Sequence, residues 1–222
     1  MRVTITAATV DEWMPGFLKM NPLYSGESNR LRVQFHQSGV GMLASAVSLT
    51  RLVLEDKPDL VIQAGIAGCF DQNIPLGTVV VVKDESLADT GVEEDGKWKD
   101  IFDLKLEKSS YHPYEKRKLP NQHLPKLNLL QLPEVNAITI NQISSSPQKI
   151  AQLTKKYEPL IESMEGAALH FVCREAGIPF IQIRSISNYI GERNKARWLL
   201  KEAIENLNET LIKYLEKLYL LP

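Results

Sequence analysis

The chain has 222 residues, 44% of them apolar and 24% charged, with 26 Lys and Arg against 27 Asp and Glu. This composition is typical of one globular domain, and the formal net charge of -1 argues against nucleic acid or a membrane surface as a partner. No apolar run approaches the roughly 18 residues of a membrane span, and we expect the first residues to form a strand and not a secretion signal. The two cysteines, Cys69 and Cys173, have no metal-binding spacing. We expect a cytoplasmic single domain over residues 1–222, without a metal or cofactor.

Apolar periodicity divides the chain into strands and helices. In order, it predicts strands at 2–8 and 31–36, a helix at 42–54, strands at 60–64, 79–82 and 135–140, a helix at 166–175, a strand at 179–186 and a helix at 197–218. A helix between two strands favours their parallel pairing. The pattern therefore predicts an α/β fold of three layers, α/β/α, around a central mixed, mainly parallel sheet.

One segment, 84–133, departs from this pattern. It begins with acidic residues and continues as a basic stretch that contains prolines, with little periodicity. A structureless loop of about fifty residues is improbable inside a compact domain. We expect short strands here, or a lid or subunit interface next to a binding site.

Ligands of α/β sheets bind beyond the carboxyl ends of the strands. After the first predicted strand come Asp11 and Glu12, either of which could serve only to cap a helix. After the second, residues 38–41 include two glycines that could bring backbone N–H groups to a ligand or simply form a turn. After the third, residues 63–68 have neither the glycine spacing of a dinucleotide site nor that of a P-loop. We expect a close-packed turn there, against which a flat group could lie.

Two later segments also carry candidate side chains. Glu165 falls in the first turn of a predicted helix, where the helix dipole favours a carboxylate that could accept hydrogen bonds from a vicinal diol. Asn188 follows an apolar strand, and its amide can both donate and accept. An ordinary acid at a helix start and an ordinary turn residue are the alternatives.

Taken together, these segments resemble the purine nucleoside phosphorylase and nucleosidase superfamily, which includes methylthioadenosine/S-adenosylhomocysteine nucleosidase. The resemblance covers most of the chain and depends on an ordered set of motifs rather than on one of them. These are Glu12 after the first strand, SGVGMLASA, KPDLVIQAGIAGCF, LGTVVVV, IESMEGAAL and IPFIQIRSISN.

The resemblance implies hydrolysis or phosphorolysis of a ribosyl N-glycosidic bond through an oxocarbenium-like sugar. It implies that Glu12 positions and deprotonates water, that Glu165 binds the 2′- and 3′-hydroxyls, and that Met164 lies against the ribose. It places Asn188 at the base edge, where adenosine nucleosidases of the family carry an aspartic acid that protonates N7. Further substrate contacts are implied for Ala64, Gly65, Ile143, Ser187 and Arg193.

Within the superfamily, the motifs NAITINQISSS and SNYIGERN are most similar to the futalosine hydrolases, which release hypoxanthine from futalosine on a route to menaquinone. An amide at position 188 suits a 6-oxopurine, because it can donate to O6 or N7 and accept from N1–H. A methylthioadenosine/S-adenosylhomocysteine or aminofutalosine nucleosidase is the alternative.

Besides Asn188, a second difference from the usual sequences of the superfamily argues against phosphorolysis. Phosphorylases usually hold phosphate with an arginine on the strand where this chain has Gln63, and Ile66 follows inside the glycine-containing segment. An arginine of a neighbouring subunit, such as Arg30 or Arg32, could restore the missing charge. A purine nucleoside phosphorylase therefore stays a further alternative.

The resemblance also implies a homodimer or larger homo-oligomer, because family members complete the 5′ end of the pocket with a neighbouring chain. Two readings outside this enzyme class remain open. A nucleoside-binding protein could keep the same pocket, although binding alone would not require Glu12. A dinucleotide-dependent enzyme would need the glycine fingerprint that this sequence lacks.

Overall fold

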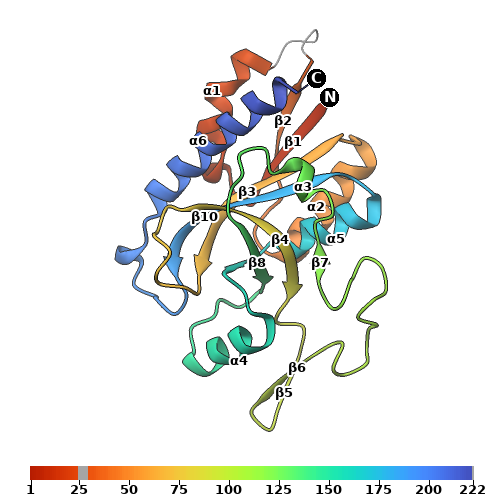
Figure 1. The fold of residues 1–222 in the computed structure, drawn as a ribbon, viewed down its shortest axis with the longest axis vertical. Helices are drawn as coiled ribbons and strands as arrows, with labels where there is room; N and C mark the ends of the chain where they lie inside the picture. The colour runs from red at the N-terminus through yellow and green to blue at the C-terminus, as the bar shows by residue number, and fades with distance from the viewer. Residues whose placement is uncertain (25–29, 222) are drawn as a thin grey trace.

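The computed structural model describes residues 1–24 and 30–221, and its centre is an eight-stranded mixed sheet (Figure 1). Its strands are β1 (Arg2–Ala7), β2 (Arg32–Gln37), β3 (Leu60–Cys69), β4 (Val79–Leu87), β7 (Leu119–Pro120), β8 (Glu134–Thr139), β9 (Ile161–Ser163) and β10 (Phe180–Tyr189). Within the described residues, five strand pairs of this sheet are parallel and three are antiparallel. The predicted mixed, mainly parallel sheet is confirmed.

Part of the sheet closes on itself. Strand β10 pairs parallel with β3 and antiparallel with β4, while β4 pairs with β8, β8 with β9, and β9 with β3. These five strands form a ring, which the sequence pattern does not predict. The closure brings the ends of β3, β9 and β10 together, because Gly68 of β3 pairs with Asn188 on one side and Glu162 on the other.

Helices cover both faces of the sheet (Figure 1). They are η1 (Val10–Glu12), α1 (Met14–Tyr24), α2 (Met42–Glu55), α3 (Leu124–Leu127), α4 (Pro147–Tyr157), α5 (Gly166–Ala176), η2 (Lys195–Arg197) and α6 (Leu200–Tyr219). Ile62 of β3 packs in one core cluster with Leu207 of α6, whereas its neighbour Val61 packs in another with Leu169 of α5. Successive strand residues face opposite sides. The three predicted layers are therefore confirmed.

The structure corrects the sequence prediction at the glycine-containing segment 63–68. This segment is not a turn, because β3 continues without interruption from Leu60 to Cys69. Its glycines allow neighbouring groups to approach the strand. A Cβ added to Gly65 would lie 2.2 Å from Nη1 of Arg184, so only glycine fits beneath this guanidinium.

Outside the segment 84–133, two α-helices and one short strand were not predicted. Helix α1 contains Pro15 and Gly16 near its start, which are poor helix formers, and it packs against α6. Helix α4 begins after Ser146, whose hydroxyl accepts a hydrogen bond from the Lys149 amide at 3.3 Å. Strand β9 has only three residues and depends on pairing with β3 and β8.

The segment 84–133 contains the end of β4, a hairpin of β5 (Gly91–Glu94) and β6 (Lys97–Asp100), strand β7 and helix α3. An ion-pair cluster fastens it to α4. Lys156 Nζ lies 3.1 Å from Asp100 Oδ2, and Arg117 Nη1 lies 2.6 Å from Asp103 Oδ1. The short strands expected here are present.

Both cysteines are free and buried. Within residues 1–24 and 30–221, no helix combines the length and the apolar character that crossing a membrane requires.

Candidate active site

A cavity of about 340 Å³ lies where β3, β9 and β10 meet, next to η1 and the start of α6. Seven of the nine residues that the sequence predicted for the site line this cavity: Glu12, Ile143, Met164, Glu165, Ser187, Asn188 and Arg193. The other two do not. Ala64 is buried in the core beside α6, and Gly65 lies beneath the Arg184 guanidinium. These two residues are therefore part of the support of the cavity, not of its surface.

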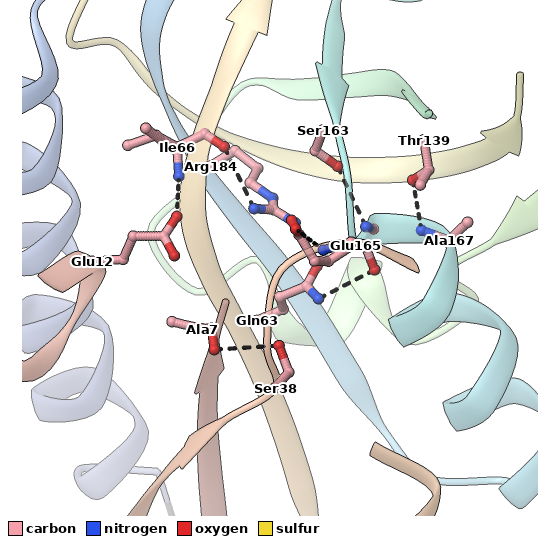
Figure 2. A network of polar contacts seen from close by, with 12 residues as sticks. Ala7, Glu12, Ser38, Gln63, Ile66, Thr139, Ser163, Glu165, Ala167 and Arg184 are labelled. Atoms are coloured by element: carbon pink, nitrogen blue, oxygen red, sulfur yellow. Dashed lines mark hydrogen bonds and ion pairs between the residues drawn. The ribbon is translucent and has the colours of Figure 1, made fainter. Parts of the chain in front are cut away.

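Glu12 ends the 3-10 helix η1, and both of its carboxylate oxygens are held. Oε1 accepts a hydrogen bond from the Ile66 amide at 3.2 Å (Figure 2). Oε2 accepts from the amide and hydroxyl of Thr9 at 3.0 and 3.1 Å. Asn208 of α6 fixes the backbone from behind by donating to the Glu12 carbonyl at 3.0 Å. Glu12 thus does cap its helix, as the simpler reading of the sequence proposed, and it also faces the cavity.

Glu165 lies directly before α5, one residue earlier than the predicted first turn. Its Oε1 accepts from the Gly41 amide at 2.9 Å, so one predicted backbone donor of residues 38–41 is occupied by protein. Burial raises the pKa of Glu165, while the charge of Arg184 and the Gly41 amide act in the opposite direction. The carboxylate keeps acceptor capacity toward the cavity, because a carboxylate offers about four lone-pair positions.

Arg184 of β10 is a part of the site that the sequence analysis missed. Its guanidinium is almost fully buried, donates to Gln63 Oε1 at 2.8 Å and to the Ile66 carbonyl at 3.4 Å, and lies 3.9 Å from Glu165 Oε2 (Figure 2). The sequence could have indicated this role, because Arg184 lies inside the apolar run IPFIQIRSIS and an arginine is rarely buried without a charged partner.

Asn188 is positioned by an irregularity in β10. The register of β10 against β3 shifts between Ile186 and Asn188, and such bulges re-aim side chains next to binding sites. The Ser187 hydroxyl donates to Asn188 Oδ1 at 2.9 Å. This bond leaves Nδ2 as the end of the amide that can donate to a ligand, although it also contacts the Tyr189 carbonyl at 3.3 Å.

The outer part of the cavity combines apolar side chains with one cation. Arg193 lies with its guanidinium carbon 5.8 Å from the ring centre of Trp198, and Ile143 is 42% exposed at the cavity. Among the described residues that line the cavity, Arg193 is the only Lys or Arg, against the five acids Asp11, Glu12, Glu162, Glu165 and Glu192. Arg193 is therefore the residue of the lining with which an anionic group of a ligand could pair.

Comparison with known proteins identifies the family. Residues 15–218 match the family described as the phosphorylase superfamily, which is nearly the whole chain. The chain belongs to this superfamily of enzymes.

Two relatives and one solved structure are similar to this chain over most of its length. The chain is 27% identical over 174 residues to a futalosine hydrolase of Thermus thermophilus, covering 77% of this chain and 76% of that protein. It is 26% identical over 200 residues to a 5′-methylthioadenosine/S-adenosylhomocysteine nucleosidase of Bacillus subtilis, covering 88% and 85%. A nucleosidase of the latter kind from Colwellia psychrerythraea, solved in complex with adenine, has the same fold, with a TM-score of 0.79 at 20% identity over 98% of this chain and 96% of that one.

Proposed function

We propose that this protein is a nucleosidase that hydrolyses the N-ribosyl bond of futalosine and releases hypoxanthine. The observation that carries the proposal is the arrangement of three side chains around one cavity, with Glu12 and Glu165 as buried carboxylates and Asn188 as an oriented amide. General-base catalysis, hydroxyl binding and base recognition each need a group of that type.

Glu12 is the proposed general base. Its two oxygens are held by Ile66 and Thr9, so the carboxylate is oriented before substrate binds, and its free lone pairs can accept a proton from water. Glu165 is the proposed partner of the ribose hydroxyls, with Met164 against the sugar. Two negative charges near a sugar that develops positive charge would stabilise the transition state more than the ground state.

Asn188 is proposed to stabilise the departing purine. Its Nδ2 can donate to N7 or O6, where negative charge accumulates as the glycosidic bond breaks. A full proton donor, such as an aspartic acid, is less needed for a 6-oxopurine than for adenine. This residue therefore supports hypoxanthine as the leaving base.

Arg193 supports futalosine over nucleosides with a neutral 5′ group. Futalosine carries a carboxylate at the end remote from its base, and Arg193 is the cation available to it at the outer part of the cavity. An arginine that binds a carboxylate in water-exposed surroundings contributes up to about 1 kcal/mol, which is enough to change substrate preference several-fold.

Water rather than phosphate is the proposed nucleophile. Arg184 is the buried cation nearest to Glu12 and Glu165, and its guanidinium is already bound to Gln63 and the Ile66 carbonyl. Two acids and, among the residues that the structure describes, no free cation at this position disfavour a phosphate dianion.

The test compares futalosine, aminofutalosine and methylthioadenosine as substrates of the wild type and of Arg193→Met. We expect futalosine to have the highest kcat/KM in the wild type, and Arg193→Met to lower this value several-fold with little effect on methylthioadenosine. Arg197→Met, in the same loop but outside the cavity lining, is the matched control. Preference of the wild type for methylthioadenosine would identify the alternative nucleosidase, to which the Bacillus subtilis relative points over a larger share of the chain.

A further inference from the structure

Glu162 lines the cavity and lies in the motif IESMEGAAL, but no role has been assigned to it. It is 6% exposed, its Oε1 accepts a hydrogen bond from the Ser144 amide at 3.2 Å, and its Oε2 is buried without a partner among the described residues. A buried carboxylate with an unused oxygen is costly unless a ligand supplies the missing donor. Glu162 can therefore accept a further hydrogen bond from a ligand in the cavity.

The strand register places Glu162 opposite Asn188. Asn188 pairs with Gly68 across one side of β3, and Gly68 pairs with Glu162 across the other side. Residues paired directly across neighbouring strands extend from the same face of a sheet. With strands spaced about 4.8 Å apart, the two Cα atoms are roughly 10 Å from each other.

Gly68 leaves the space between these two side chains open. A Cβ added to it would lie 3.2 Å from Asn188 Nδ2 and 2.5 Å from Ile190 Cδ1, so any larger residue would occupy this space. All three residues line the cavity. A flat ring can lie over the glycine with one edge toward the amide and the other toward the carboxylate.

We propose that Glu162 determines the choice of base by accepting a hydrogen bond from N1–H of a 6-oxopurine. An ionised carboxylate accepts and cannot donate. A 6-oxopurine carries a hydrogen on N1, whereas adenine has a lone pair there, which the carboxylate cannot satisfy. Burial raises the pKa of Glu162, and a donor from the base would favour its ionised form.

This inference deepens the proposed function and depends on it for the orientation of the base. The test measures binding of the free bases hypoxanthine and adenine by calorimetry in mildly alkaline buffer, which does not require that any nucleoside is cleaved. We expect the wild type to bind hypoxanthine at least tenfold more tightly. In Glu162→Gln, whose amide oxygen can still accept from Ser144, we expect this preference to fall roughly tenfold to hundredfold.

Glu205→Gln is the matched control, because it makes the same substitution at an exposed acid of α6 outside the cavity lining and should leave the preference unchanged. An unchanged preference in Glu162→Gln, or a wild type that prefers adenine, would overturn the inference. If Glu162→Gln does not fold, 1-methylhypoxanthine replaces it as the probe. It lacks the N1 hydrogen and should bind the wild type at least tenfold more weakly than hypoxanthine, whereas equal binding would contradict the proposed contact.

The two proposals can fail separately. Hypoxanthine preference that depends on Glu162, without cleavage of futalosine, would retain the base contact and remove the proposed substrate. Cleavage of futalosine with a base preference that is unchanged in Glu162→Gln would retain the proposed substrate and remove the base contact.

Discussion

The two acids of the proposed mechanism differ in how the protein holds them. Glu12 receives hydrogen bonds from Thr9 and Ile66 on both oxygens, while Glu165 receives one from Gly41 and lies 3.9 Å from Arg184. The better-fixed carboxylate suits the positioning of one water molecule. The other suits contacts to substrate hydroxyls that shift as the sugar distorts.

We expect Glu12→Gln to lower kcat by about two or more orders of magnitude with little change in KM, because a general base contributes about 10²–10⁴-fold. The glutamine oxygen can still accept from Ile66, but its NH₂ group would face the donors of Thr9, so thermal unfolding must accompany the kinetics. Steady-state kinetics with Asp11→Asn as the control measure this effect. A near-normal kcat would leave Glu12 with its capping role alone.

Glu165→Ala should lower kcat and raise KM together, because contacts to the ribose hydroxyls both hold the substrate and stabilise its distorted sugar. The same substitution leaves the buried Arg184 without its nearby acid, so thermal unfolding must accompany the kinetics. Normal kinetic constants in a folded variant would remove Glu165 from the sugar site.

At the scale of the structural elements, the start of α5 is held by Thr139, which is bonded to the buried carboxyl group of Glu85. Neither residue has a proposed catalytic role. Thr139 donates to Glu85 Oε1 at 3.0 Å and accepts from the Ala167 amide at 2.7 Å. Burial raises the pKa of Glu85 from 4.5 to about 7. The folded protein therefore holds a proton on Glu85 that the unfolded chain releases.

This raised pKa predicts a pH dependence of stability. Between pH 4.5 and about 7 the folded state binds more protons at Glu85, so its contribution to the free energy of unfolding falls as pH rises. The slope can reach about 1.4 kcal/mol per pH unit. The pKa of His170 is lowered by burial to about 4, which gives the opposite slope, but this group is common to the wild type and Glu85→Gln.

Urea unfolding of the wild type and Glu85→Gln at both ends of this pH range isolates the effect. The variant should gain stability relative to the wild type as pH rises toward 7. Parallel pH dependences of the two proteins would show that Glu85 is ionised in the folded state.

The sequence predicted elements well where hydrophobic periodicity decides the structure, as in α2, where the helix expected at 42–54 runs from Met42 to Glu55. The prediction failed where contacts between residues distant in the sequence determine the structure. The glycines of β3 indicate a turn when only the local sequence is considered. In the structure Gly65 instead leaves space for the guanidinium of Arg184, which is distant in the sequence. Glu162 was missed for a related reason, since only the pairing of β9 with β3 brings it opposite Asn188.

At the scale of the whole molecule, the predicted homo-oligomer has a candidate interface on α2. Its apolar side chains Leu43, Val47 and Leu54 are 78%, 51% and 67% exposed. Val40, two residues before this helix, is 59% exposed and lines the cavity. A second copy that covers this face would also enclose the outer part of the cavity, which no described residue of 84–133 reaches within one chain.

We expect light scattering to show a homodimer for the wild type and a monomer with reduced activity for Leu43→Glu. Leu18→Glu, which changes an equally apolar residue of α1 that is 65% exposed, should leave the dimer intact. A wild-type monomer with full activity would contradict the prediction.

In the proposed reaction, this protein transfers the ribosyl group of a 6-oxopurine nucleoside to water. Chromatography of a futalosine reaction in phosphate-free buffer tests it most directly, with a parallel reaction that contains added phosphate. We expect free hypoxanthine and the dehypoxanthinyl sugar in equal amounts, formed at the same rate in both reactions. Absence of hypoxanthine without phosphate, or a sugar 1-phosphate when phosphate is supplied, would contradict it.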